Sequence, residues 1–189
     1  HAVTLYESLR ARFRLRSRWG DADVALAVCG RHQVENALAA AAAAFVCGLS
    51  VEEVAAALAT ATLSPWRMEL TRASGGALVL NDAYNANPTS TLAALESLAA
   101  LPADRRIAVL GVMAELGAES NTAHAAVTAE AARLGVRVVA VAARQYGAED
   151  VDSVEEAVEL LGPLGAGDAV LVKGSRVAGL ERLAELLLS

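Results

Sequence analysis

The second part of the sequence alternates short, continuous apolar segments with longer amphipathic ones. A strand with one face in water would alternate apolar and polar residues, whereas these segments are apolar throughout, which favours a parallel sheet covered on both faces. The helical segments between them show the 3.6-residue period. The sequence predicts a doubly wound α/β domain, with functional loops at the carboxyl ends of its strands. The predicted strands are 77–80, 107–110, 136–141 and 169–172, and the predicted helices are 89–101, 121–134, 154–161 and 177–187.

The segment before Pro65 follows a different pattern. Arginine occupies every second position from Arg10 to Arg18, which predicts a strand with one solvated face, and a turn at Gly20 leads into a returning strand over 24–29. Two helices are expected after this β-ribbon, over 32–47 and over roughly 50–60, the second opened by the capping box of Ser50 and Glu53. Ser64 and Pro65 interrupt the pattern, so we expect a boundary that separates residues 1–63 from residues 64–189. Two further strands, 68–71 and 77–80, are expected to pair across the turn at 74–76.

Composition excludes several classes of protein. The longest apolar run, 37–47, is too short to cross a membrane, and no basic, leucine-rich leader opens the sequence, so we expect a cytoplasmic protein without a membrane partner. The net charge of −6 opposes nucleic-acid binding, and the arginine stripe is interpreted as a solvated face. Neither the two cysteines, which we expect to be buried, nor the three histidines form a metal-binding motif.

Three loops that follow predicted strands carry polar side chains. The first contains Asp82, Tyr84 and Asn85 and ends with Asn87, a good N-cap, and Pro88. The second, 111–117, contains Glu115 and precedes His124, which we interpret as a surface histidine. The third loop places Lys173, Ser175 and Arg176 at the expected start of the last helix, where free N–H groups favour anions.

Lys173 is the only lysine among the 16 basic residues. A position that keeps an ammonium where all others carry guanidinium is a candidate catalytic point charge, although an escape from a coding bias explains it equally well. The chain has no P-loop, because Val172 rather than glycine precedes this lysine. The glycines of 162–167 have the wrong order for a dinucleotide-binding fingerprint and precede a strand.

Five motifs, taken together in their order and spacing, resemble the Mur ligase family. The resemblance covers most of the chain from Gly30 onward. It implies a Rossmann-like C-terminal domain over 64–189, preceded by the end of a central ATPase domain over 1–63. The P-loop, the magnesium ligands and the domain that binds the UDP-sugar would lie upstream of His1. The motifs are GRHQVENALAAA at 30–41, WRME at 66–69, NDAYNANP at 81–88, GVMAELG at 111–117 with His124, and VKGSR at 172–176.

Within the family, the pair NDAYNANP and KGSR resembles the ligases that add D-alanyl-D-alanine to UDP-N-acetylmuramoyl-tripeptide in peptidoglycan precursor synthesis. The resemblance implies an ATP- and Mg²⁺-dependent amide ligation through an acyl phosphate, with this chain inactive alone. A folylpolyglutamate or cyanophycin ligase domain is the enzymatic alternative, and a noncatalytic binding module on the same fold is a different alternative, which the missing P-loop favours.

The resemblance also assigns roles to individual residues. His32 and Asn36 would bind the adenine side of the nucleotide, Arg67 its phosphates and Asp82 its ribose. Gln33 stands where the family has asparagine, a departure that concerns the adenine contacts. The residues that would line the acceptor side, where the dipeptide carboxylate needs a partner, are Asn85, Asn87, Glu115, Lys173, Ser175 and Arg176.

Overall fold

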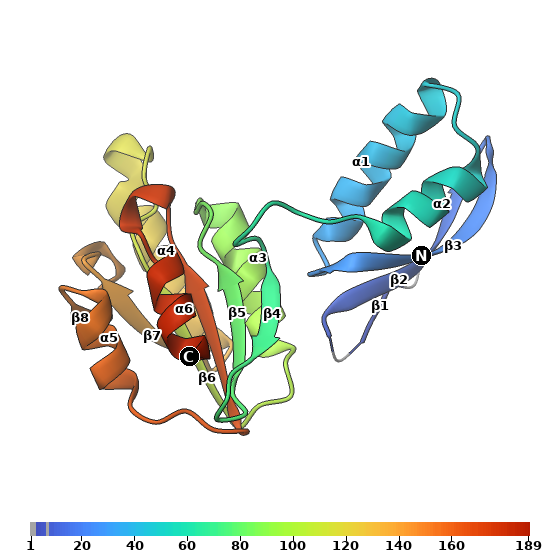
Figure 1. Cartoon of the computed structure of the whole chain (residues 1–189). Coiled ribbons are helices and arrows are strands. Elements are labelled where there is room, and N and C mark those ends of the chain that lie inside the picture. The colour runs from blue at the N-terminus through green and yellow to red at the C-terminus, as the bar shows by residue number, and fades with distance from the viewer. Residues whose placement is uncertain (1–2, 7) are drawn as a thin grey trace. The chain divides into compact units, whose positions relative to one another are not determined.

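The computed structural model describes residues 3–6 and 8–189 and divides the chain into two compact units between Ser64 and Pro65 (Figure 1). This division lies one residue from the boundary that the sequence predicts. Proline disfavours a helical conformation at the residue before it, which is one physical reason why the pattern of the first unit stops here. No helix among the described residues is long and apolar enough to span a membrane.

The first unit packs a small antiparallel sheet against two helices. The arginines of the central strand face water, while Ala11, Phe13 and Leu15 between them are buried against the helices. The predicted β-ribbon and both helices are therefore confirmed, and a short third strand joins the ribbon. The capping box is formed, since Ser50 Oγ accepts from Glu53 N and Glu53 Oε2 accepts from Ser50 N. The elements are β1 (Thr4–Leu5), β2 (Arg10–Ser17), β3 (Gly20–Cys29), α1 (Gln33–Val46) and α2 (Val51–Thr60).

The second unit is a six-stranded sheet of order β4-β5-β9-β6-β7-β8, parallel except for the antiparallel edge strand β4. Helices α3 and α4 pack together, as do α5 and α6, and the two pairs cover opposite faces of the sheet (Figure 1). The expected doubly wound α/β domain is confirmed. Its strands are β4 (Glu69–Arg72), β5 (Leu78–Asp82), β6 (Arg105–Leu110), β7 (Arg137–Val141), β8 (Glu149–Val151) and β9 (Asp168–Lys173), and its helices are α3 (Pro88–Ala99), α4 (Ser120–Arg133), α5 (Val154–Leu161) and α6 (Glu181–Leu188).

The central strands are buried on both faces, as their continuous apolar sequences require. Every residue of β5 and β9 is buried. Val79 and Val172 belong to the core that includes α5 and α6, whereas the intervening Leu80 and Leu171, which are fully buried, point to the opposite face. A sheet with two such faces leaves only its strand ends and edges for function.

Four local predictions are wrong. The last helix begins at Glu181, not at 177, because residues 176–178 form a 3₁₀ turn that Gly179 ends in the left-handed conformation (φ 62°). Strand β8 was not predicted, since its sequence, Glu-Asp-Val, has no apolar run. Contrary to the prediction, the two cysteines are not fully buried. Cys47 is exposed because it follows the last turn of α1, and Cys29 is only half-buried because it is the last residue of the edge strand β3. His124 is buried, as described below.

Candidate functional site

The three polar loops meet at one edge of the sheet. Asp82 ends β5 and lies in register with Lys173, which ends β9, and Leu110, which ends β6, is the neighbour of Lys173 on the other side. Adjacent parallel strands whose connections leave toward opposite faces form a crevice outside their carboxyl ends. The chain has this arrangement because β5 and β6 lead into α3 and α4, while β9 between them leads toward α6.

A buried ion pair lies at the centre of this edge. Lys173 Nζ donates to Asp82 Oδ2 at 2.5 Å and to the carbonyl oxygen of Asn85 at 2.8 Å. The side chains of Lys173 and Asp82 are only 2% and 13% exposed. Asp82 Oδ1 accepts from Met68 N at 3.1 Å, so one carboxylate joins β9 to the start of β4. Both hydrogen-bond partners of the ammonium are thus protein groups.

The expected anion site at the start of the last helix is not formed around Lys173. Ser175 does not cap that helix: its Oγ accepts from Ala114 N at 2.8 Å and donates to the carbonyl oxygen of Ala86 at 3.2 Å. Ser175 therefore connects the loop after β5 with the loop after β6. Ser175 is itself buried, so it fixes the positions of these two loops from inside the protein.

Two arginines lie over aromatic rings beside the ion pair. The guanidinium carbon of Arg67 is 3.8 Å from the centroid of Tyr84, and that of Arg176 is 4.1 Å from the centroid of Trp66. Arg176 also pairs with Glu181 at 3.2 Å. Such stacking holds a guanidinium plane in place while its edge N–H groups can still bind anions. Tyr84 and Trp66 are thus part of the site. Their positions in the sequence did not show that their rings would hold the two arginines.

Backbone strain accompanies the arginine. Trp66 and Met68, on either side of Arg67, both have left-handed conformations, with φ of 63° and 52°. Glu115 of the loop after β6 is also left-handed, with φ of 66°. Non-glycine residues rarely adopt this region, and such strain concentrates at functional sites. Asp82 accepts from the amide of Met68, so the residue that follows Arg67 in this strained turn is bound directly to the carboxylate at the end of β5.

Three other predicted residues lie on the surface around this edge. Asn87 caps α3, as expected, through a capping box in which its Oδ1 accepts from Ser90 N at 2.8 Å. Asn85 is exposed, and its side-chain oxygen accepts from Ala86 N at 2.9 Å. Glu115 is exposed as well. The structure therefore joins Lys173 directly to Asp82 and to the backbone of Asn85, while Ser175 binds the neighbouring loop residues Ala86 and Ala114, and Arg67 and Arg176 stack on aromatic rings.

His32 and Asn36 belong to the first unit, at the start of α1. Gln33 connects them: its Nε2 donates to His32 Nε2 at 3.3 Å, and its Oε1 accepts from Asn36 Nδ2 at 2.9 Å. The glutamine that departs from the family pattern is buried and fixes both neighbours. In the described part of the chain, no group of three or more His, Cys, Asp or Glu side chains could hold a metal ion.

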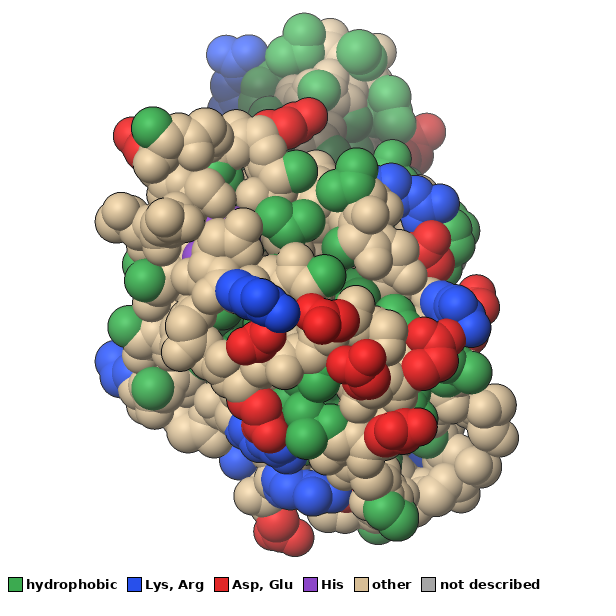
Figure 2. All heavy atoms as spheres, turned by 90° about the vertical axis from the view of Figure 1, so that its left-hand side faces the viewer, with side chains coloured by type: hydrophobic (Ala, Val, Ile, Leu, Met, Phe, Trp, Pro, Cys, Tyr) green, Lys and Arg blue, Asp and Glu red, His purple; other side chains and the backbone are tan. Residues whose placement is uncertain are grey.

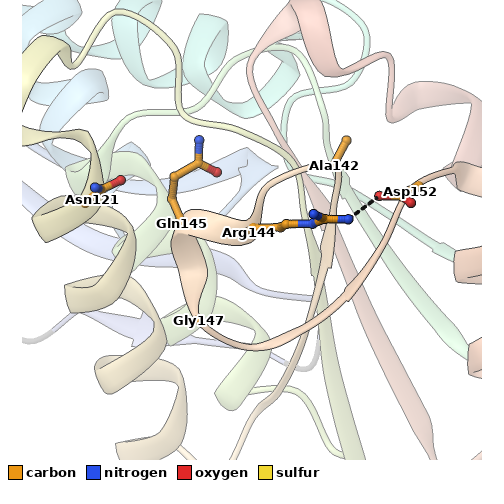
Figure 3. A pocket seen from close by; sticks show the side chains of 6 residues that line it. All are labelled: Asn121, Ala142, Arg144, Gln145, Gly147 and Asp152. Carbon is orange, nitrogen blue, oxygen red and sulfur yellow. Dashed lines mark hydrogen bonds and ion pairs between the residues drawn. The ribbon is translucent and has the colours of Figure 1, made fainter.

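A hollow separate from this edge lies beyond the end of β7. This pocket of about 700 Å³ is open to solvent and is lined by Asn121, Ala142, Arg144, Gln145, Gly147 and Asp152 (Figure 3). Arg144 is shared between Asp150 and Asp152, each at 3.3 Å. Figure 2 shows the surrounding face, where acidic side chains gather with arginines among them. Two carboxylates thus surround this one arginine, and their excess negative charge disfavours an anion in the hollow.

Comparison with known proteins identifies the family. The family described as Mur ligase, glutamate ligase domain, matches residues 66–176, which include all three loops. The chain belongs to the Mur ligase family. Among curated relatives of this Mur ligase chain, UDP-N-acetylmuramoyl-tripeptide--D-alanyl-D-alanine ligase of Mycobacterium tuberculosis is 41% identical, in a match covering 99% of the chain and 44% of the relative.

Solved structures agree on the Mur ligase fold. MurF from Acinetobacter baumannii has a TM-score of 0.87 at 30% identity, over 98% of this chain and 43% of that protein. MurF ligase from Thermotoga maritima in complex with ADP has a TM-score of 0.85 at 24% identity, over 99% of this chain and 45% of that protein. The chain thus spans less than half the length of the relatives it matches.

Proposed function

We propose that this chain is the C-terminal part of an ATP-dependent ligase that joins D-alanyl-D-alanine to UDP-N-acetylmuramoyl-tripeptide in peptidoglycan precursor synthesis. The observation that carries the proposal is the 41% identity to a curated ligase of that name over 99% of the chain. The site geometry supports it, because the polar loops shared with the family converge on one edge of the sheet. The reaction, its substrates and a cytoplasmic location all belong to the proposal.

The chemistry requires stabilised negative charge on a transferring phosphoryl group, and exclusion of water from the acyl phosphate. Arg67, stacked on Tyr84, is the cation proposed for the nucleotide phosphates. Asp82 is proposed for the ribose hydroxyls, since each of its carboxylate oxygens can accept a second hydrogen bond beside the one from Met68 or Lys173. In the first unit, His32 and Asn36 are proposed for the adenine.

The acceptor side is proposed around the other end of the same edge. Arg176 is the exposed cation suited to the dipeptide carboxylate, and Asn85, Asn87 and Glu115 offer amide and carboxylate groups at the surface. Lys173 and Ser175 are buried, and they are proposed to act by holding Asp82 and the loops around it. The described residues offer no cluster suited to Mg²⁺, so its ligands are proposed to lie in the part of the enzyme before this chain.

The test compares this chain with the complete enzyme to which it belongs. Dipeptide-dependent release of ADP is expected from the complete enzyme when UDP-N-acetylmuramoyl-tripeptide is supplied, and none from the 189-residue chain, which lacks a P-loop. A complete enzyme that ligates glutamate to a folate, or that ligates nothing, would overturn the proposal. Activity of the isolated chain would show that it is not a fragment.

The nucleotide role of Asp82 is tested within that enzyme. Asp82→Ala is expected to raise the KM for ATP, with Asp152→Ala, at the exposed hollow beyond β7, as the matched control. An unchanged KM together with a large fall in melting temperature would assign Asp82 a purely structural role. The melting temperature must be measured in both variants, because removal of Asp82 also leaves the buried Lys173 ammonium without its carboxylate.

A further inference from the structure

His124, expected at the surface, is completely buried in the first turns of α4. Both nitrogens of its ring are engaged by backbone groups. Nδ1 lies 2.6 Å from the carbonyl oxygen of Ser120, and Nε2 lies 3.0 Å from Met113 N. A carbonyl oxygen can only accept and a backbone amide can only donate, so Nδ1 carries the proton and Nε2 carries none. The contacts therefore select one neutral tautomer of the imidazole.

Met113 belongs to the 111–117 loop, which follows β6 and carries Glu115 at the edge of the sheet. Three separate elements hold the first half of this loop. His124 accepts from the Met113 amide, and Tyr146, from the turn after β7, donates its hydroxyl to the carbonyl oxygen of Gly111 at 3.1 Å. On the other side Ser175 accepts from Ala114 N. The backbone directly before the strained Glu115 is thus fixed at Gly111, Met113 and Ala114.

The ring itself is held by packing. His124 meets the Tyr146 ring edge-on, with centroids 4.6 Å apart and planes at 76°. Three elements contact the imidazole within the described residues: the turn after β7 through Tyr146, α4 through Ser120, and the 111–117 loop through the backbone of Met113. Of these groups, Tyr146 is the titratable one. Burial raises the pKa of Tyr146 well above its usual range, so the phenol stays neutral.

We propose that His124 is a positioning residue of the ligase: as a hydrogen-bond acceptor it fixes the Met113 amide, and through it the conformation in which the 111–117 loop presents Glu115 at the surface after β6. The catalytic consequence rests on the proposed function, whereas the hydrogen bond and its effect on the loop do not.

The structural part is tested by NMR on the 189-residue chain. Imidazole ¹⁵N shifts are expected to show a proton on Nδ1 and none on Nε2 of His124. Hydrogen exchange of the Met113 amide should accelerate about tenfold or more in His124→Leu, which removes the acceptor. It should stay near the wild-type rate in His124→Gln, whose Oε1 can accept but cannot titrate near neutral pH.

Ser97→Ala is the control. Ser97 is buried in α3, which packs against α4, and its Oγ donates to the carbonyl oxygen of Ala93 at 2.8 Å, so the variant removes a hydrogen bond that does not involve His124, Tyr146 or the 111–117 loop. Met113 exchange should be unchanged in this variant. Equal acceleration in Ser97→Ala and His124→Leu, a proton on Nε2, or unchanged exchange in His124→Leu would each overturn the proposal.

The catalytic part is tested in the complete enzyme. His124→Leu is expected to lower kcat about tenfold, while His124→Gln, which keeps an acceptor for the Met113 amide, retains most of it. If His124→Leu does not fold, His124→Gln decides: wild-type Met113 exchange together with most of the wild-type kcat supports the positioning role, and wild-type exchange with a tenfold loss of kcat overturns it. Unchanged kcat and KM in a variant with a released loop would overturn the positioning role. A wild-type enzyme without ligase activity would instead overturn the proposed function, and the NMR result would still stand.

Discussion

The two units differ in how completely they bury their apolar surface. In the second unit helices cover both faces of the sheet, and the strands β5 and β9 have no exposed residue. In the first unit one face of the small sheet is a solvated stripe of arginines. Helix α6 of the second unit exposes the apolar Leu186, whereas α1 exposes six apolar residues, Leu38, Ala39, Ala40, Ala42, Ala43 and Val46. A helix that is apolar around much of its surface is typical of a core position. The second unit therefore has the layers of an autonomous domain, and the first does not.

The two units also differ in how far their ion pairs are exposed to water. The ion pairs of the first unit, such as Arg14 with Asp23 at 3.0 Å, lie in water, with both side chains about half or more exposed. The Asp82–Lys173 pair of the second unit is buried at the carboxyl edge of the sheet. A buried pair demands that each partner remain in place, whereas an exposed pair demands little. The charged groups that the fold cannot lose are thus the ones at the candidate site.

The largest expected effect comes from separating the two units. Residues 65–189 produced alone should unfold in one cooperative transition, because their core is complete, whereas residues 1–64 alone should show no cooperative melt and should bind hydrophobic dyes or aggregate. Circular dichroism during heating measures both. A cooperative melt of 1–64 at low concentration would show that its exposed helix face needs no cover, and would remove the contrast between the units.

The sequence predicts the second unit well because its signals are local and mutually consistent. Apolar strands, the Asn87 cap and the Pro88 start all specify one arrangement, and the structure follows it. The sequence predicts less well where long-range contacts decide. Nothing near His124 in the sequence shows that a backbone amide eleven residues earlier will draw it into the core. The 3₁₀ turn at 176–178 interrupts a helical pattern because a glycine takes the left-handed conformation after it.

At the candidate site, too, the sequence predicts local features better than long-range contacts. Motif residues could be named individually, but sequence spacing could not reveal that Lys173 faces Asp82, since the two are 91 residues apart and meet only through the parallel pairing of β5 and β9. The expectation of an anion beside Lys173 considered the helix that follows it and overlooked the strand beside it. The cation–π partners Tyr84 and Trp66 were likewise beyond what spacing alone could show.

The next largest effect contrasts the two kinds of ion pair. Lys173→Met should destabilise the second unit by about 3 kcal/mol or more, since it leaves the Asp82 carboxylate buried without a cation. Arg14→Met, in the first unit, should change stability by less than about 1 kcal/mol. Urea denaturation measures both, with fluorescence of Trp66 and of Trp19 reporting the second and first units separately.

A double variant checks the reason for that difference. Lys173→Met combined with Asp82→Leu should recover much of the loss, because a pair of apolar side chains carries no buried charge. No recovery would mean that the loss in Lys173→Met came from packing, and the buried pair would then differ little from the exposed ones in energetic terms.

A smaller effect contrasts two glycines. A Cβ at Gly111, in the second unit, would lie 2.6 Å from Ala178 Cβ, while Gly48, in the first, has open space around it but a φ of +92°. Asparagine tolerates positive φ and adds bulk. Gly111→Asn should therefore cost about 1–3 kcal/mol through overpacking, and Gly48→Asn less than about 1 kcal/mol. Thermal denaturation compares them, and equal losses would contradict the difference in packing between the units.

The smallest effect concerns acid stability of the second unit. Asp168, which starts β9, accepts from Arg105 Nε at 2.6 Å, and this hydrogen bond holds the pKa of the carboxyl below its usual value. A depressed pKa in the folded state contributes stability that is present above the ordinary pKa of aspartate, about 4, and is lost as pH falls through the folded value. Asp168→Asn should therefore lower the melting temperature at pH 7 and flatten its decline between about pH 4 and pH 2.

Asp23→Asn, on the exposed sheet face of the first unit, is the control. It should leave the acid limb of the second unit, the fall of its melting temperature below about pH 4, as it is in wild type. An acid limb as steep in Asp168→Asn as in wild type would show that Asp168 contributes nothing to the pH dependence, and that the charges near the amino end of β9, unlike those at its carboxyl end, behave like the solvated pairs of the first unit.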